Sequence, residues 1–160
     1  MNRIAMTDTE LLIYRHLLLS HLDYVETHRK DTEYRSLSFR ECLLVMFPMG
    51  APSLVTTDGT RLSIQASKSH YCHSDLYSEK LGIEHRSNIG PWRSYEVTSG
   101  NIVEEPDESW EKYWSEDGLW SYIPSRMVAD YLDKHGEITE TYSNGIYLSL
   151  IHISEPTRPY

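Results

Sequence analysis

The dipeptide Asp58-Gly59 constrains the fold of this chain more than any other feature. It lies between two apolar-rich segments within residues 53–67, SLVTT and TRLSIQAS. Asp-Gly suits the positive-φ positions of a tight hairpin turn. Leu62 and Ile64 then alternate with polar residues, which is the period of a strand with one face on a core. The sequence therefore predicts an antiparallel hairpin here.

Capping signals predict two helices before the hairpin. Thr7 and Glu10 have the spacing of a capping box at the start of residues 6–31, and Ser38 and Glu41 repeat it before the apolar run 42–47. The second run is short, so a helix is favoured over a buried strand mainly by its cap, and Pro48 ends it. The long first helix is expected to bury a stripe formed by Leu11, Leu18, Leu22 and Val25.

The second half of the chain reads as strands alternating with helices. Strands are expected at residues 92–102, 119–124 and 137–142, and a short helix near Pro106. A longer helix is expected at residues 125–136, with Gly136 just after it. Its buried side would hold Val128, Tyr131, Leu132 and His135. Residues 68–90 read as a long loop.

This order of elements predicts an α+β fold with a single domain over residues 1–147. An antiparallel or mixed sheet of about four to five strands would be packed by an N-terminal and a C-terminal helix. A chain of 160 residues is suited to one hydrophobic core.

Composition limits the cellular compartments and the classes of partner that are expected for this chain. No apolar run approaches the roughly 20 residues of a membrane helix, and the N-terminus lacks a signal-peptide core, so a cytoplasmic protein is expected. A net charge of −9 opposes direct nucleic-acid binding. Cys42 and Cys72 are too few to indicate a disulfide framework. No cofactor-binding motif is present.

One group of residues suggests chemistry. Thiolate and imidazole are zinc ligands, so a metal site is one interpretation of His70, Cys72, His73 and His85, although their spacing matches no standard zinc motif. Cys72 beside a histidine could instead be a thiolate nucleophile. The alternative is a core cysteine with solvated histidines. On balance catalysis is not expected.

A second group mixes acids with aromatic residues. A carboxylate-rich surface can imitate a nucleic-acid backbone and occupy the basic groove of another protein. The alternative is a solvated helix face, with the two tryptophans at i and i+4 packing inward. The group comprises Glu104, Glu105, Asp107, Glu108, Glu111, Trp110 and Trp114.

A third group brings aromatic residues close to arginines in the sequence. Aromatic planes beside guanidinium groups suit a nucleotide-like small molecule. The same aromatic residues could instead fill the core or an oligomer interface. The candidate ligand-binding residues are Tyr71, Arg86, Trp92, Arg93 and Tyr95.

The segments IQASKSHYC, SYEV and YIPSRMVADYLDKHG resemble those of small proteins from Firmicutes phages, plasmids and gut metagenomes. The resemblance implies an accessory protein of a mobile element acting in a bacterial cytoplasm, and it implies no catalytic residue. The last residues, 148–160, resemble the translation of a sequencing-adapter end. They are therefore expected to be a non-native tail that stands in place of the natural C-terminal sequence.

Together these features lead us to expect a non-enzymatic binding protein that inhibits a host protein or sequesters a nucleotide-like signalling ligand. Small size, acidity and many Trp and Tyr side chains favour this reading. Two alternatives stay open. One is a small metal- or thiol-dependent enzyme centred on His70, Cys72 and His73, and the other is a homo-oligomeric structural component of a phage.

Overall fold

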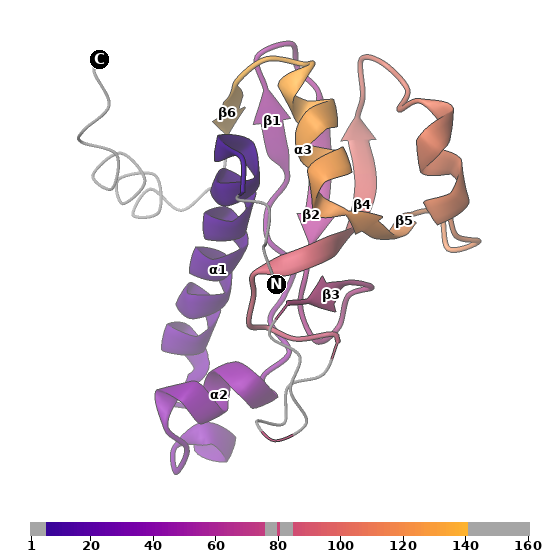
Figure 1. Cartoon of the computed structure of the whole chain (residues 1–160). Coiled ribbons are helices and arrows are strands. Elements are labelled where there is room, and N and C mark those ends of the chain that lie inside the picture. The colour runs from indigo at the N-terminus through magenta and orange to yellow at the C-terminus, as the bar shows by residue number, and fades with distance from the viewer. Residues whose placement is uncertain (1–5, 76–79, 81–84, 141–160) are drawn as a thin grey trace.

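The computed structural model describes residues 6–75, 80 and 85–140. Within these residues the chain is a single-domain α+β fold whose helices pack on a six-stranded antiparallel sheet (Figure 1). The expected fold class is confirmed. In chain order the elements are α1 (Asp8–His28), η1 (Thr32–Tyr34), α2 (Phe39–Val45), β1 (Leu54–Thr56), β2 (Arg61–Gln65), β3 (His73–Ser74), β4 (Trp92–Asn101), η2 (Glu108–Tyr113), β5 (Trp120–Pro124), α3 (Ser125–Asp133) and β6 (Ile138–Glu140).

The predicted hairpin is confirmed as β1 and β2. Leu54 pairs with Leu62, and Gly59 has a φ of 90°, a left-handed value that suits glycine. Asp58 Oδ1 accepts the Thr60 backbone N–H at 3.0 Å and the Thr56 hydroxyl at 2.8 Å, which closes the turn. Leu62 and Ile64 are fully buried, as their alternation predicts.

Strand β4 organises the sheet because it pairs with three other strands. Ser94 pairs with both His73 of β3 and Pro124 of β5. Val97 pairs with Ile64 of β2 and with Trp120 of β5. One edge of β4 therefore carries β2 and then β3, while the other edge carries β5. On the far side of β2, β1 pairs with β6.

Both capping boxes form, so α1 begins after Thr7 and α2 after Ser38. The expected buried stripe of α1 is wrong in phase, because only Val25 of its four residues is fully buried. Leu11, Leu18 and Leu22 are half-buried. The core instead receives the face that includes Ile13, His16, Leu17, Ser20 and His21.

Backbone carbonyls explain how α1 can turn two histidines inward. The Nε2 atom of His16 lies 2.8 Å from the Pro52 carbonyl oxygen, and Nε2 of His21 lies 2.6 Å from that of Ala66. A buried polar group that is hydrogen-bonded costs far less than one that is not. Hydropathy alone cannot anticipate these acceptors, which are distant in sequence.

Helix α3 packs beside α1 over the sheet (Figure 1). Its expected inward residues, Val128, Tyr131, Leu132 and His135, are all buried, as predicted. Gly136 follows with a φ of 99°, and a side chain there would meet the Thr57 hydroxyl oxygen at 1.8 Å. Glycine is thus required both for the backbone angle and for the space.

The helix expected near Pro106 differs from the prediction. It is the 3-10 helix η2, and the Asp107 side chain caps it by accepting the Ser109 N–H at 2.8 Å. Trp110 is buried, but Trp114 follows the end of the helix with 53% of its surface exposed. The alternative in which both tryptophans pack inward therefore holds for Trp110 and fails for Trp114, because a 3-10 turn does not place positions i and i+4 on one face.

No helix among the described residues is long and apolar enough to span a membrane. The last expected strand is seen as β6, and the rest of its predicted range, like the proposed tail at 148–160, lies outside the described residues.

Candidate functional site

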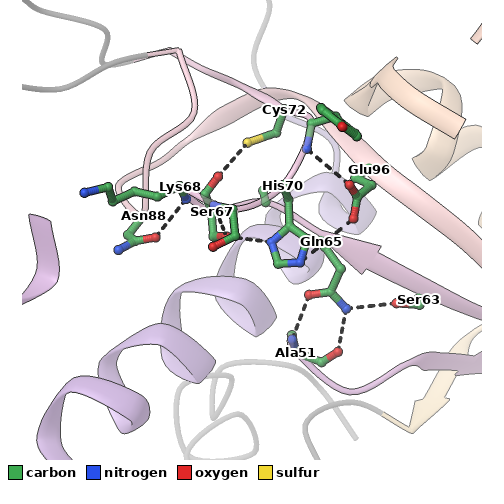
Figure 2. A network of polar contacts seen from close by, with 12 residues as sticks. Ala51, Ser63, Gln65, Ser67, Lys68, His70, Cys72, Asn88 and Glu96 are labelled. Atoms are coloured by element: carbon green, nitrogen blue, oxygen red, sulfur yellow. Dashed lines mark hydrogen bonds and ion pairs between the residues drawn. The ribbon is translucent and has the colours of Figure 1, made fainter. Parts of the chain in front are cut away.

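A polar network joins the end of β2 to β4 and contains two of the residues considered for catalysis (Figure 2). The Nδ1 atom of His70 lies 2.6 Å from Ser67 Oγ, and its Nε2 lies 3.9 Å from a Glu96 carboxylate oxygen. Burial lowers the pKa of His70, and the nearby Glu96 carboxylate opposes this effect. The Cys72 thiol donates to the Ser67 carbonyl at 3.4 Å.

The network extends through two amides that bind the backbone of other segments. The Gln65 side chain accepts the Ala51 N–H and donates to the Ala51 carbonyl, both at 2.7 Å. Asn88 accepts the Lys68 N–H at 3.0 Å and donates to the Met46 carbonyl at 2.7 Å. These contacts tie the segment that contains Met46 and Ala51 to the end of β2 and to the loop that contains Asn88. The network is therefore well suited to a structural role.

The geometry gives no support to the metal or thiolate interpretations. Nowhere in the described chain do three His, Cys, Asp or Glu side chains come close enough to hold a metal ion. His73 instead stacks on Tyr122 with ring centres 4.6 Å apart, and His85 meets the His73 ring edge-on. Cys72 is fully buried, and burial raises the pKa of its thiol to about 11, so at neutral pH it is protonated.

The expected small-molecule residues are not all brought together. Trp92 and Tyr95 are buried in the hydrophobic core at 1% and 0% exposure, which removes them from any ligand-binding surface. Arg93 is exposed and pairs with Asp75 at 3.0 Å. Tyr71 and Arg86 do meet, with the guanidinium carbon 4.6 Å from the ring centre. Trp92 and Tyr95 are both buried although they are three residues apart, whereas a regular strand would place them on opposite faces. The register of β4 against β3 shifts between the pairs at His73 and Ser74, and this irregularity accounts for the difference.

The acidic and aromatic residues form two open cavities, here called the acidic grooves. The first groove has a volume of about 590 Å³ and lies between η2 and α3. Five carboxylates and one lysine contribute to its lining, so its charge is strongly negative. These residues are Glu104, Glu105, Asp107, Asp130, Asp133 and Lys134, with Trp110, Tyr131, Ser109 and Met127 completing the lining.

The second groove has a volume of about 580 Å³ and shares Glu105, Asp107 and Trp110 with the first. It is more apolar, since its remaining lining comes from Ser99, Ile102, Pro106, Glu111, Trp114 and Trp120. Of the sequence-predicted acidic set, only Glu108 lines neither groove.

A continuous row of aromatic rings lies along both grooves. Ring centres are 4.9 Å apart for Trp114 and Trp120, 5.2 Å for Trp120 and Trp110, and 5.3 Å for Trp110 and Tyr131. His135 ends the row 4.5 Å from Tyr131. Tilted and edge-on contacts of this kind are favourable. Only Trp114 among these five rings is substantially exposed, which leaves indole surface available in the second groove.

Hydrogen bonds fix the walls of the first groove. Tyr131 donates its hydroxyl to the Glu104 carbonyl at 2.5 Å, and burial raises the pKa of Tyr131 to about 12, so it remains protonated. Hydrogen bonds from the Ser109 hydroxyl and N–H lower the pKa of Asp107, which is therefore ionised at neutral pH. The Asp133 carboxylate accepts the hydroxyl of Thr9 from α1.

Sequence reasoning missed the contribution of α3. Asp130 and Asp133 are three residues apart, a spacing that places two side chains on neighbouring positions of a helix surface, but nothing local indicates that they face η2. No family model, curated protein or solved structure matches the chain. The acidic grooves are therefore assigned on geometry alone.

Proposed function

We propose that this protein is a non-enzymatic binding protein that recognises the basic side chains of a partner protein. Arginine or lysine side chains of the partner would enter the acidic grooves. The observation that carries the proposal is the pair of adjoining cavities in which carboxylates surround aromatic surface.

Charge supports a cationic occupant. Glu105 and Glu111 are exposed, and neither pairs with a cation in the described part of the chain. A guanidinium or ammonium group would gain charge-assisted hydrogen bonds from them. The excess of acidic residues over the whole chain would also steer a basic partner toward the protein.

Aromatic surface supports an arginine in particular. The planar guanidinium stacks well on indole, and Trp114 is the exposed indole of the second groove. Tryptophan is also strongly enriched among the residues that dominate binding energy at interfaces. We therefore expect Trp114 to be the central contact of the second groove.

The mobile-element resemblance suggests what such a partner would be. A host protein with a basic, nucleic-acid-facing surface presents several arginines and lysines in a groove. An acidic accessory protein that occupies this surface would inhibit the host protein by competing with its nucleic acid. Inhibition of such a host protein is the function that we propose.

A fluorescein-labelled arginine-rich peptide is a suitable probe for the grooves. Charge reversal of Glu105 and Glu111 to lysine should weaken its binding, measured by fluorescence anisotropy, by at least about tenfold, since each exposed ion pair contributes up to about 1 kcal/mol and the new charges repel. Trp114→Ala should also weaken binding while leaving the net charge unchanged.

The matched control reverses Glu26 and Glu33, two exposed carboxylates near the C-terminal end of α1. Both double variants change the net charge equally, so a groove-specific site predicts a much larger loss for the first. Equal losses, together with no effect of Trp114→Ala, would show that the peptide responds only to overall charge and would refute the proposal.

A further inference from the structure

A second cluster of side chains, which shares strand β5 with the second groove, has the opposite charge preference. It is formed by Tyr71, His73, His85, Arg86 and Tyr122, and is called the arginine–tyrosine cluster below. Arg86 is its centre. The guanidinium carbon lies 4.6 Å from the centre of the Tyr71 ring, and Nη2 donates to the Tyr122 hydroxyl at 3.2 Å.

These two contacts orient Arg86 without neutralising it. In the described part of the chain no carboxylate forms an ion pair with Arg86, and the neighbours that raise its pKa are Tyr122, Tyr71 and Cys72 rather than acids. A guanidinium has five N–H donors, and the bond to Tyr122 uses one of them. An oriented, exposed guanidinium with unused donors is well suited to bind an oxyanion.

The backbone of Tyr122 is specifically arranged to hold this cluster. Its φ is 56°, a left-handed value that residues with a side chain seldom adopt, and its N–H donates to the Tyr71 carbonyl at 3.2 Å. The Tyr122 ring consequently lies 5.8 Å from the Tyr71 ring and 4.6 Å from the His73 ring. Unusual backbone conformations that are held in this way are concentrated at functional sites.

Two histidines extend the cluster beside Arg86. The His73 ring meets the His85 ring edge-on at 5.6 Å, and Nδ1 of His73 lies 3.0 Å from Ser94 Oγ. Imidazole N–H groups are hydrogen-bond donors that an oxyanion can use. Arg93 lies nearby in sequence, but its ion pair with Asp75 makes it a weaker contributor.

We propose that the arginine–tyrosine cluster binds a phosphorylated small molecule. Its phosphoryl group would bind to Arg86, beside His73 and His85, and its organic part would pack on the rings of Tyr71 and Tyr122. This site is independent of the proposed function, because the acidic grooves repel the same ligand. It retains Tyr71 and Arg86 from the sequence-based set and replaces the buried Trp92 and Tyr95 with Tyr122, His73 and His85.

Isothermal titration calorimetry of the full chain at low ionic strength tests this site, with AMP, ribose 5-phosphate, inorganic phosphate and adenosine as probes. We expect saturable one-to-one binding of AMP and none of adenosine. Binding of inorganic phosphate as tight as that of AMP would contradict the proposed packing of the organic part on the tyrosine rings, and would leave only an anion site at Arg86. Tighter binding of AMP than of ribose 5-phosphate would show that the base also contacts the tyrosines.

Four variants make the test specific. Arg86→Gln should weaken AMP binding by at least about tenfold, whereas Arg40→Gln, which removes the same charge from the exposed face of α2, should leave it unchanged. Arg86→Lys keeps the charge but loses the paired N–H donors of the planar guanidinium, so it should bind AMP more tightly than Arg86→Gln but less tightly than the wild type. Tyr122→Phe removes the hydroxyl that orients Arg86 and should weaken binding even if Arg86→Gln proves poorly folded.

Absence of saturable binding by all three phosphate-containing probes would overturn the proposal. So would equal weakening by Arg86→Gln and Arg40→Gln, because it would show only a long-range effect of charge. Binding of adenosine as tight as that of AMP would also overturn it.

Discussion

The Nδ1 atom of His135, just beyond α3, lies 2.6 Å from Oδ2 of Asp58 in the β1–β2 turn. Although desolvation raises the pKa of Asp58, hydrogen bonds from Thr56, Thr60 and His135 outweigh it and hold the pKa well below its ordinary value. The ionised carboxylate can only accept, so Nδ1 of His135 carries the proton. One carboxylate thus closes the hairpin turn and also anchors the C-terminal end of α3.

Replacement of Asp58 should therefore destabilise two elements at once. We expect Asp58→Ala to lower the midpoint of urea unfolding more than Asp58→Asn, because asparagine keeps an acceptor for the Thr56 hydroxyl and the Thr60 N–H. The contribution of the charge should be present above the unfolded-state pKa of about 3.8 and disappear as the pH falls below it. An Asp58→Ala protein with the midpoint of the wild type would contradict this.

Acid should also weaken the fold through His16 and His21. Burial lowers the pKa of each to about 4, from 6.5 when unfolded, against the effect of the carbonyl that each one contacts. Since the unfolded chain binds protons more tightly, their contribution to stability is complete above pH 6.5 and is lost toward pH 4. The loss amounts to about 3 kcal/mol per histidine.

Urea unfolding at a series of pH values measures this loss. A His21→Met variant, although less stable at neutral pH, should show a shallower decline between pH 6.5 and 4 because one titrating group is gone. His28→Met provides the control, because it also removes an imidazole from α1 but from a partly exposed position. Identical slopes for His21→Met and the wild type would show that His21 does not control acid sensitivity.

The orientation of α1 can be tested with adjacent leucines. Leu17 is fully buried, so Leu17→Ala should cost about 2–5 kcal/mol of unfolding free energy. Leu18, the next residue around the helix, is only half-buried, and Leu18→Ala should cost less than half as much. Chemical denaturation measures both values. A larger loss of unfolding free energy for Leu18→Ala would support the buried stripe that the sequence predicts for α1.

The thiol of Cys72 should react slowly in the native protein. Its burial and its raised pKa, about 11, leave little accessible thiolate at pH 7.5. Mass spectrometry after brief treatment with iodoacetamide should find Cys72 unmodified in native protein and modified in urea. Rapid modification of the native protein would revive the hypothesis of a thiol-dependent enzyme.

Elements coded by neighbouring residues could be predicted from the sequence. Both capping boxes and the Asp58-Gly59 turn depend on residues at most three apart, and each forms as expected. The interior face of α3 was likewise predictable, because its apolar residues repeat with the helical period.

Features that depend on distant partners could not be predicted in this way. The acceptors of His16 and His21 are carbonyls 36 and 45 residues away, so these histidines resemble surface residues in the sequence. The acidic grooves combine η2 with α3, and the arginine–tyrosine cluster joins residue 71 to residue 122. The exposed position of Trp114 depends on where a 3-10 helix ends, which local patterns define poorly.

The pairing of β4 with β5 has a genetic consequence. Trp120 contributes to the second groove and Tyr122 to the arginine–tyrosine cluster, and the ladder from Ser94–Pro124 to Val97–Trp120 fixes both. A slip of one residue in this ladder would turn both side chains to the opposite face. If both proposed sites bind, mutations that abolish one proposed binding activity alone would therefore map to side chains, whereas mutations that abolish both together would map to the register of β4 and β5.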